Sequence, residues 1–309
     1  MNRPDPPTRP LRRALPWVVV LTLVWGTNWV LLPIAVREVS VWTFRSTCLL
    51  GAGLLSLGIA RGLRLSLHVP RAQRPALVMA ALVYLVVWNV GSTYAAVLIP
   101  SGQAAVLGFT MPLWATLVSW LVFAERPSAR LLGSLALAAC GVGCLAWAAR
   151  HSYASAPLGF LLGLLAGLGW AGGTLILQRG ALRISPIVST GWQLLIAGVP
   201  IALVAAATGT GAAFVPSWTT LLVIGYVTIV PMVLGNIAWF SIVGMLPASV
   251  SGLATVMVPM VAMATGAVVH AEPLGLLQLA AMACCATSLL LVVRSPRAGG
   301  GGTGGGEAH

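Results

Sequence analysis

Residues 100–125 read PSGQAAVLGFTMPLWATLVSWLVFAE, and residues 247–272 read PASVSGLATVMVPMVAMATGAVVHAE. Both stretches begin with Pro, carry a second Pro twelve positions later and end in Ala-Glu. They lie 147 positions apart, and the same offset places Asn89 on Asn236. Because two prolines, a terminal Ala-Glu and an upstream asparagine match in one register, we infer that the chain contains an internal repeat.

The composition around this repeat is that of a membrane protein. Of the 309 residues, 59% are hydrophobic and 7% are charged, whereas soluble globular proteins carry about 25% charged residues. So few charges cannot cover a water-facing surface, which excludes a soluble enzyme, a nucleic-acid-binding domain and a disordered regulator. The five cysteines lie in apolar runs without metal-ligand spacing, so we expect reduced thiols and neither a metal nor another cofactor.

Clusters of Arg, Pro and polar residues divide the chain into ten apolar runs, and a membrane-spanning helix needs about 20 such residues. Only helices and closed barrels satisfy their backbone groups in lipid, and these continuous Leu- and Ala-rich runs lack the alternation of strands. We therefore predict an all-α integral membrane protein. The predicted spans are residues 16–36, 42–60, 76–97, 101–123, 131–148, 157–178, 187–207, 218–240, 247–269 and 275–293.

The repeat places five predicted spans in each half, and this odd number makes the two halves face opposite sides of the membrane. Inverted repeats of this kind are common in secondary transporters, whose substrate sites lie near the midplane between the repeats. Of the 17 Arg, 14 fall on the same side as the N-terminus. Since cytoplasmic loops carry the excess of basic residues, we predict a cytoplasmic basic tail of residues 1–15 and a cytoplasmic Gly-rich tail of residues 294–309.

Several motifs resemble a known family. Residues 25–29, Trp-Gly-Thr-Asn-Trp, resemble the Trp-Gly-Ser-Asn-Phe pattern that opens EamA domains, and Arg45 resembles that family's Arg in the second helix. The run from Tyr94 through Pro112 to Arg126 resembles the rest of one EamA repeat, and the second half resembles another more weakly. Within the drug/metabolite transporter superfamily, the chain is most similar to YddG-type exporters of aromatic and other neutral amino acids.

The resemblance implies two EamA-like repeats, residues 16–148 and residues 157–293, packed as two inverted five-helix halves around a central cavity. It implies that the first, third, fourth, sixth, eighth and ninth spans line this cavity, and that the fifth and tenth spans are peripheral. It also implies a carrier rather than an enzyme.

Charges inside the predicted spans limit the kind of solute. No Asp or Glu lies at the centre of a span, whereas a proton-coupled exporter of cations needs a buried carboxylate. Arg45 alone lies within a span, whereas a carrier of phosphorylated solutes needs several cations. A neutral or zwitterionic, partly apolar solute remains. Arg45 has two interpretations: it anchors the second helix at the outer interface, paired with Glu38 or a lipid phosphate, or it binds a substrate carboxylate.

Polar and aromatic side chains within the cavity-lining spans are candidate substrate contacts, because apolar walls with a few polar groups suit an amphipathic ligand. The same amides also fit hydrogen bonds between helices, and the same rings fit lipid or core packing. Pro112 and Pro259, which match in the repeat, are candidate hinges or static kinks. The candidate substrate-binding residues are Trp25, Asn28, Tyr84, Asn89, Gln103, Trp170, Tyr226, Asn236 and Ser251.

These observations favour a secondary transporter that exports neutral amino acids, aromatic ones included, across the inner membrane by alternating access. A broader metabolite or drug facilitator of the same superfamily is the alternative. A membrane enzyme would need converging acid and histidine groups at depth, and a non-transporting scaffold would need long loops or a soluble domain. The expected partners are amino acids and the lipid bilayer, without nucleic acid, and the expected state is a monomer or a weak homodimer.

Overall fold

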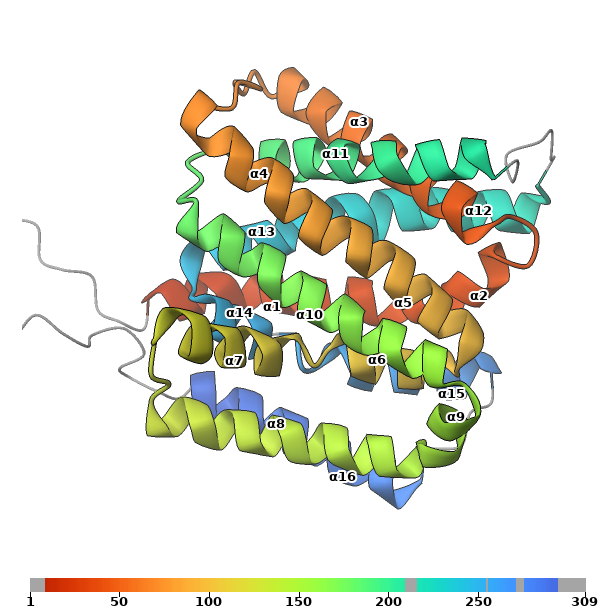
Figure 1. Ribbon diagram of the computed structural model, residues 1–309, viewed down its shortest axis with the longest axis vertical. Coiled ribbons are helices and arrows are strands. Elements are labelled where there is room, and N and C mark those ends of the chain that lie inside the picture. Colours follow the sequence, from red (N-terminus) through yellow and green to blue (C-terminus); the bar gives the residue numbers. More distant parts are fainter. Residues whose placement is uncertain (1–8, 209–215, 254, 271–274, 294–309) are drawn as a thin grey trace, which may run out of the picture.

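The computed structural model describes residues 9–208, 216–253, 255–270 and 275–293. Within these ranges the regular secondary structure is helical and contains no strand, which confirms an all-α protein. The helices run side by side across the view in Figure 1. Large apolar side chains cover their outer faces: Leu121 and Leu222 are each 71% exposed and Val268 is 87% exposed. Such a surface fits lipid rather than water.

The helical elements follow one another with short connections. They are α1 (Arg9–Asn28), η1 (Trp29–Leu31), α2 (Leu32–Ala35), α3 (Val41–Gly62), η2 (Arg71–Gln73), α4 (Arg74–Ala80), η3 (Ala81–Val86), α5 (Val87–Leu98), α6 (Ser101–Gly108), α7 (Met111–Phe123), α8 (Ala129–Ala148), α9 (Arg150–Ser155), α10 (Pro157–Arg179), α11 (Pro186–Ala207), α12 (Trp218–Val227), η4 (Thr228–Gly235), α13 (Asn236–Met245), α14 (Ala248–Leu253), α15 (Val258–His270) and α16 (Leu276–Val293).

Eight helical segments are long and apolar enough to cross a membrane, and each coincides with one of the first eight predicted spans. The ninth and tenth predicted spans correspond to two shorter apolar helices, Val258–Val269 and Leu279–Ser288. The protein is therefore a multi-pass membrane protein, and ten complete spans stay a prediction. The eight segments are Arg13–Ala35, Val41–Gly62, Arg71–Leu98, Gly102–Phe123, Ala129–Ala148, Pro157–Arg179, Pro186–Ala207 and Trp218–Met245.

The first helix begins before the first predicted span. α1 starts at Arg9 and includes Arg12 and Arg13, whereas the apolar run starts at residue 16. An apolar run marks where lipid begins, but a helix can continue beyond it over good helix formers such as Arg, Leu and Ala, and α1 does so although Pro16 stands inside it. Residues 1–8 and 294–309, which hold the rest of the two predicted tails, lie outside the described residues.

Two helix pairs flank the centre of the molecule. α3 packs along α11, and α8 packs along α16. In Figure 1 these pairs lie toward opposite edges, and α1 and α10 lie between them. α10 packs on α5 and α6, and α1 packs on α13 and α15. The fifth and tenth predicted spans, α8 and α16, are thus peripheral as the resemblance implied.

The repeat appears as matching local structure in the two halves. The third and eighth predicted spans each contain a π-helical stretch, η3 and η4. In the first half the Asn89 side-chain amide donates a hydrogen bond of 2.7 Å to the Leu85 carbonyl oxygen. In the second half the Asn236 amide donates one of 2.8 Å to the Met232 carbonyl oxygen. Both bonds keep the offset of 147 positions, and π-helical stretches frequently mark functional sites.

The fourth and ninth predicted spans are broken at matching places. α6 ends at Gly108 and α7 begins at Met111, so Pro112 is the second residue of a new helix. α15 begins at Val258, which gives Pro259 the same position. We expected both prolines to kink a continuous span. Instead they stand in a first helical turn, where the missing N–H has no intrahelical partner to lose and the fixed φ favours the start of a helix.

Candidate functional site

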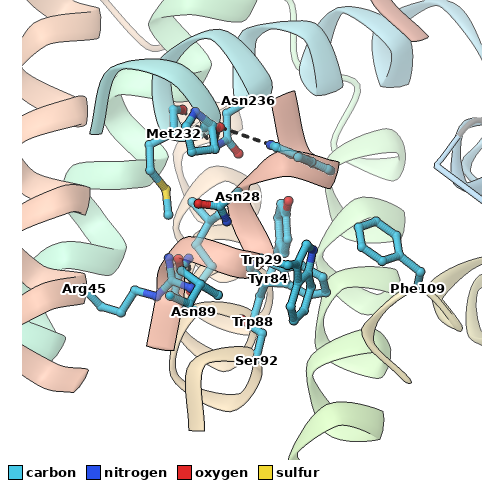
Figure 2. Close-up of a pocket in the computed structure, with 14 residues that line it drawn as sticks. Asn28, Trp29, Arg45, Tyr84, Trp88, Asn89, Ser92, Phe109, Met232 and Asn236 are labelled. Atoms are coloured by element: carbon cyan, nitrogen blue, oxygen red, sulfur yellow. Dashed lines mark hydrogen bonds between the residues drawn. The ribbon is translucent and has the colours of Figure 1, made fainter. Parts of the chain in front are cut away.

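A central cavity lies where five spans converge. Its volume is about 30 Å³, which is room for one or two water molecules and far below the ~300–1,000 Å³ of small-molecule sites. Figure 2 shows its polar and aromatic side chains converging from separate helices. The lining residues are Trp25, Asn28, Trp29, Leu32, Arg45, Tyr84, Leu85, Trp88, Asn89, Ser92, Phe109, Pro231, Met232 and Asn236.

The structure brings together part of the predicted site. The lining comes from the first, third, fourth and eighth spans, as the resemblance implied, and the second span adds Arg45. The sixth and ninth spans contribute no lining residue among the described residues. The predicted substrate-binding residues in the lining are Trp25, Asn28, Tyr84, Asn89 and Asn236.

Residue spacing explains most of the lining that the prediction missed. Positions 25, 28, 29 and 32 on the first span are spaced i, i+3, i+4 and i+7, and so are positions 85, 88, 89 and 92 on the third. Residues at this spacing share one helix face. Extending each face from Asn28 and Asn89 would have added Trp29 and Trp88. Met232 precedes Asn236 by four positions, as Leu85 precedes Asn89, whereas Phe109 follows no such pattern.

Trp170 lies behind the cavity wall rather than in it. Its ring is fully buried and packs against five other rings, and centroid separations of 4.5–7 Å are typical of favourable aromatic pairs. The centroid distances are 5.3 Å to Trp25, 5.8 Å to Tyr84, 4.7 Å to Trp88, 5.5 Å to Phe109 and 4.9 Å to Trp239. This aromatic cluster closes one side of the cavity.

Trp25 is fixed in that cluster by its own hydrogen bond. The indole Nε1–H donates to the Pro231 carbonyl oxygen at 3.1 Å, which connects α1 to η4. A Cβ placed on Gly235 would lie 2.2 Å from Trp25 Nε1, so the indole passes directly over glycine backbone. The first and eighth spans therefore meet at this ring.

Arg45 is buried in the cavity wall, with 1% of its surface exposed. Its Nε–H donates to the Thr93 hydroxyl, and that hydroxyl donates to the Asn89 carbonyl oxygen at 2.6 Å. Nη1 has no hydrogen-bond partner among the described residues. The interpretation of Arg45 as an interface anchor paired with Glu38 is wrong, because the guanidinium is enclosed by protein and the Glu38 carboxylate accepts from the Ser217 backbone N–H at 3.0 Å.

Three amide oxygens are buried at the cavity without a partner. The Nδ2 groups of Asn89 and Asn236 donate to backbone carbonyls of their own helices. Their Oδ1 atoms, and Oδ1 of Asn28, have no hydrogen-bond partner among the described residues. The cavity thus presents three acceptors and one cationic donor that the protein itself leaves unsatisfied.

The remaining predicted contacts lie elsewhere. The Gln103 carbonyl oxygen accepts from the Tyr153 hydroxyl at 3.1 Å. The Ser251 hydroxyl donates to the Leu246 carbonyl oxygen at 3.0 Å, and the Tyr226 hydroxyl is 2.9 Å from the Thr27 hydroxyl. None of these three predicted residues lines the central cavity. Pro112 and Pro259 meet at a separate small apolar cavity of about 20 Å³.

Two larger cavities lie at the end of the molecule where α10 and α13 finish. Their volumes are about 420 Å³ and about 400 Å³, and both are lined by Gln178 and Pro247. Beside them Arg179 Nη2 is 2.6 Å from Glu125 Oε1, which ties the end of α7 to the end of α10. The partner of Glu125 therefore comes from the other half of the chain.

Comparisons with known proteins agree with this architecture. The model of the EamA-like transporter family matches residues 12–147 and 157–294. A relative from Bacillus subtilis (strain 168), "Uncharacterized transporter YvbV", is 25% identical over 278 residues, which cover 88% of this chain and 89% of that protein. A chain of known crystal structure, 17% identical in sequence, matches at a TM-score of 0.72 over 91% of this chain and 96% of its own length. Since the family model matches both halves, the chain belongs to the EamA-like transporter family, a family of membrane transporters.

Proposed function

We propose that this protein is a secondary transporter that exports neutral amino acids, aromatic ones included, across the inner membrane by alternating access. The proposal places both termini in the cytoplasm and arranges ten spans as two inverted halves. One observation carries it: the central cavity combines an aromatic wall with a buried guanidinium and three unpaired amide oxygens. An aromatic amino acid offers a complementary group to each of these parts.

The charge of the cavity supports a solute without net charge. Arg45 is the charged member of the lining, while Glu38 and Glu125, the acidic residues in the described part of the chain, lie elsewhere. A cationic solute would face the like charge of Arg45 without a carboxylate to offset it. A zwitterion brings one carboxylate to the guanidinium and leaves the total charge of the site unchanged.

The size of the cavity supports a mechanism with a conformational change. A volume of about 30 Å³ holds water but no amino acid. Along α13, Trp239 stands between Asn236 of the central cavity and Val243 of the 420 Å³ cavity. A solute that moves from one cavity to the other has to displace the aromatic cluster, and the helix breaks before Pro112 and Pro259 are the hinges we propose for this movement.

Counterflow in proteoliposomes tests the proposal. The purified protein is reconstituted with unlabelled phenylalanine inside and labelled phenylalanine outside, beside protein-free liposomes as the control. We expect transient accumulation of label that external tryptophan or leucine inhibits. Equal counterflow of chemically unrelated solutes would favour the broader metabolite or drug facilitator. Folded protein that moves no amino acid with saturation would contradict the assignment.

A further inference from the structure

We propose that the central cavity, once it widens in the conformational change proposed above, holds a zwitterionic head group, whose carboxylate binds Arg45 and whose ammonium binds the side-chain oxygens of Asn28, Asn89 and Asn236. The inference rests on the proposed function and names the chemical class that the site selects. A ligand that carries both charges satisfies every unpaired polar group of the cavity, and a ligand that lacks either charge leaves part of them buried and unpaired.

The guanidinium defines the carboxylate side. A buried charge without a partner is unfavourable, and an ionised group in a protein interior is normally paired or hydrogen-bonded. Arg45 Nε is taken by Thr93, while Nη1 has no partner among the described residues and lies in the wall of the cavity. A carboxylate is the anion that a guanidinium pairs with in planar, charge-assisted hydrogen bonds.

The asparagines define the ammonium side. Because Nδ2 of Asn89 and of Asn236 donates to a backbone carbonyl oxygen one turn earlier, the orientation of each amide is set and its oxygen is the free atom. Asn28 adds a third free oxygen. An ammonium group has three N–H donors and no acceptor, which matches three acceptors in number and in kind. Figure 2 shows these amides and Arg45 around one pocket, from α1, α3, α5 and α13.

Thr93 connects the two sides and is a positioning residue. Its hydroxyl accepts from Arg45 and donates to the main-chain carbonyl oxygen of Asn89, so the guanidinium is tied to the helix that carries this asparagine. A carboxylate and an ammonium attached to the same carbon form the head group that we propose for this arrangement. The aromatic rings of Trp29, Trp88 and Phe109 line the same cavity and are the contacts that we propose for the side chain of the ligand.

Three ligands of similar shape separate the two sides: phenylalanine, phenethylamine, which lacks the carboxylate, and 3-phenylpropionate, which lacks the ammonium. Binding to the purified full chain in detergent is measured by isothermal titration calorimetry. Wild type should bind phenylalanine about tenfold or more tightly than either analogue, since one charge-assisted hydrogen bond contributes about 1.5–3 kcal/mol. Equal affinity for all three ligands would overturn the inference.

Variants on the two sides of the site should weaken the binding of different ligands, and we call this result the crossed pattern. Arg45→Gln should weaken the binding of phenylalanine and 3-phenylpropionate but not that of phenethylamine, which is relieved of the like charge of Arg45. Asn89→Ala and Asn236→Ala should weaken phenylalanine and phenethylamine and leave 3-phenylpropionate unchanged. Arg37→Gln, an exposed arginine at the same end of the molecule, is the matched control and should change none of the three affinities. A misfolded variant loses all ligands together, so a uniform loss in variants that still give a monodisperse elution peak contradicts the division of roles.

These measurements distinguish failure of the proposed transport function from failure of the proposed head-group site. If the crossed pattern is found and counterflow detects no movement, the head-group site stands and transport does not. If wild type binds alanine or leucine but not phenylalanine, the head-group site stands and the aromatic preference does not. If folded wild type binds none of phenylalanine, leucine and alanine, the head-group inference is overturned.

Discussion

At the scale of single residues, Trp170 holds the aromatic cluster together. Its ring is fully buried and contacts rings from both halves of the chain, among them Trp88 and Trp239. We predict that Trp170→Ala lowers the free energy of unfolding by about 3–5 kcal/mol, the usual result of truncating a buried aromatic side chain. Chemical denaturation in detergent measures this loss. Trp218→Ala removes an indole that is 81% exposed, and an equal loss in that variant would contradict a packing role for Trp170.

Glu38 gives a prediction that depends on pH. It lies between α2 and α3, outside the spans, and hydrogen bonds from the Thr220 side chain and the Ser217 backbone lower its pKa. A carboxylate with a lowered folded-state pKa stabilises the protein above its ordinary pKa, and that contribution is lost as the pH falls through the lowered value. The difference in melting temperature between wild type and Glu38→Gln should therefore shrink as the pH falls from neutral to about 3. A difference that is constant with pH would argue against this role.

The spacing of residues along the sequence predicts which residues line the candidate site only where those residues share one face of a helix. Trp25, Asn28 and Asn89 are polar or aromatic positions within the face of a span, and the cavity contains them. Arg45 was harder to place because it stands one turn inside its helix, near the apparent end of a span. Whether such a residue contacts lipid or protein depends on which other helices pack against that end of the helix. The residues near Arg45 in the sequence do not indicate which helices these are.

At the scale of helices, α10 depends on glycine where it crosses the third span. A Cβ on Gly173 would lie 2.4 Å from Tyr84 Cβ and 2.9 Å from the Ala80 carbonyl oxygen, so neither helix has room to yield by side-chain movement alone. We predict that Gly173→Ala lowers the melting temperature and displaces Tyr84 from the cavity wall. Gly143→Ala in α8 is the control, because its Cβ meets nothing within 4 Å.

The outcome for the control follows from helix propensity. Alanine is favoured over glycine in a helix interior by about 1 kcal/mol, so Gly143→Ala should melt at the wild-type temperature or slightly above it. Thermal unfolding followed by circular dichroism in detergent measures both variants. A Gly173→Ala protein as stable as the control would mean that α10 and η3 separate without cost.

Helix breaks are more predictable than π-helical stretches. Pro112 and Pro259 predicted kinks in the fourth and ninth spans, and helix breaks occur next to both prolines. The wide turns of η3 and η4 gave no comparable pattern, since a single extra residue in a turn changes the apolar spacing very little. Asn89 and Asn236 were visible in the sequence as a matched pair, but the hydrogen bonds that they donate to the preceding turn were not.

At the scale of the whole molecule, the distribution of Arg predicts that both termini lie in the cytoplasm. A fluorescent protein fused after the last residue should therefore fluoresce in cells, and alkaline phosphatase fused at the same position should be inactive. The same pair of reporters inserted beside Arg150 should give the opposite result, because that loop is predicted on the outer side. Matching results at both positions would contradict an odd number of spans per half.

The general architecture could be predicted from the sequence, and the state of the cavity could not. The repeat and the apolar runs depend on composition and offset, which are properties of the sequence, and the family resemblance implied the peripheral place of α8 and α16. Closure of the cavity to about 30 Å³ depends on how the rings around Trp170 pack against one another. Such packing arises from residues distant in the chain, and the sequence alone does not specify its geometry.

The matched asparagines have a consequence for the symmetry of the molecule. A dimer of two identical copies of the first half would supply the Asn89 amide twice, but it would also bury two guanidinium groups, because every copy would carry its own Arg45. Counted from the serines that precede α3 and α11, Ser40 and Ser185, the position equivalent to Arg45 is Thr190, which is fully buried and uncharged. The two halves thus share the amide, while the first half carries the cation. Two halves that differ in this way give the proposed head-group site two chemically different ends, which identical halves could not do.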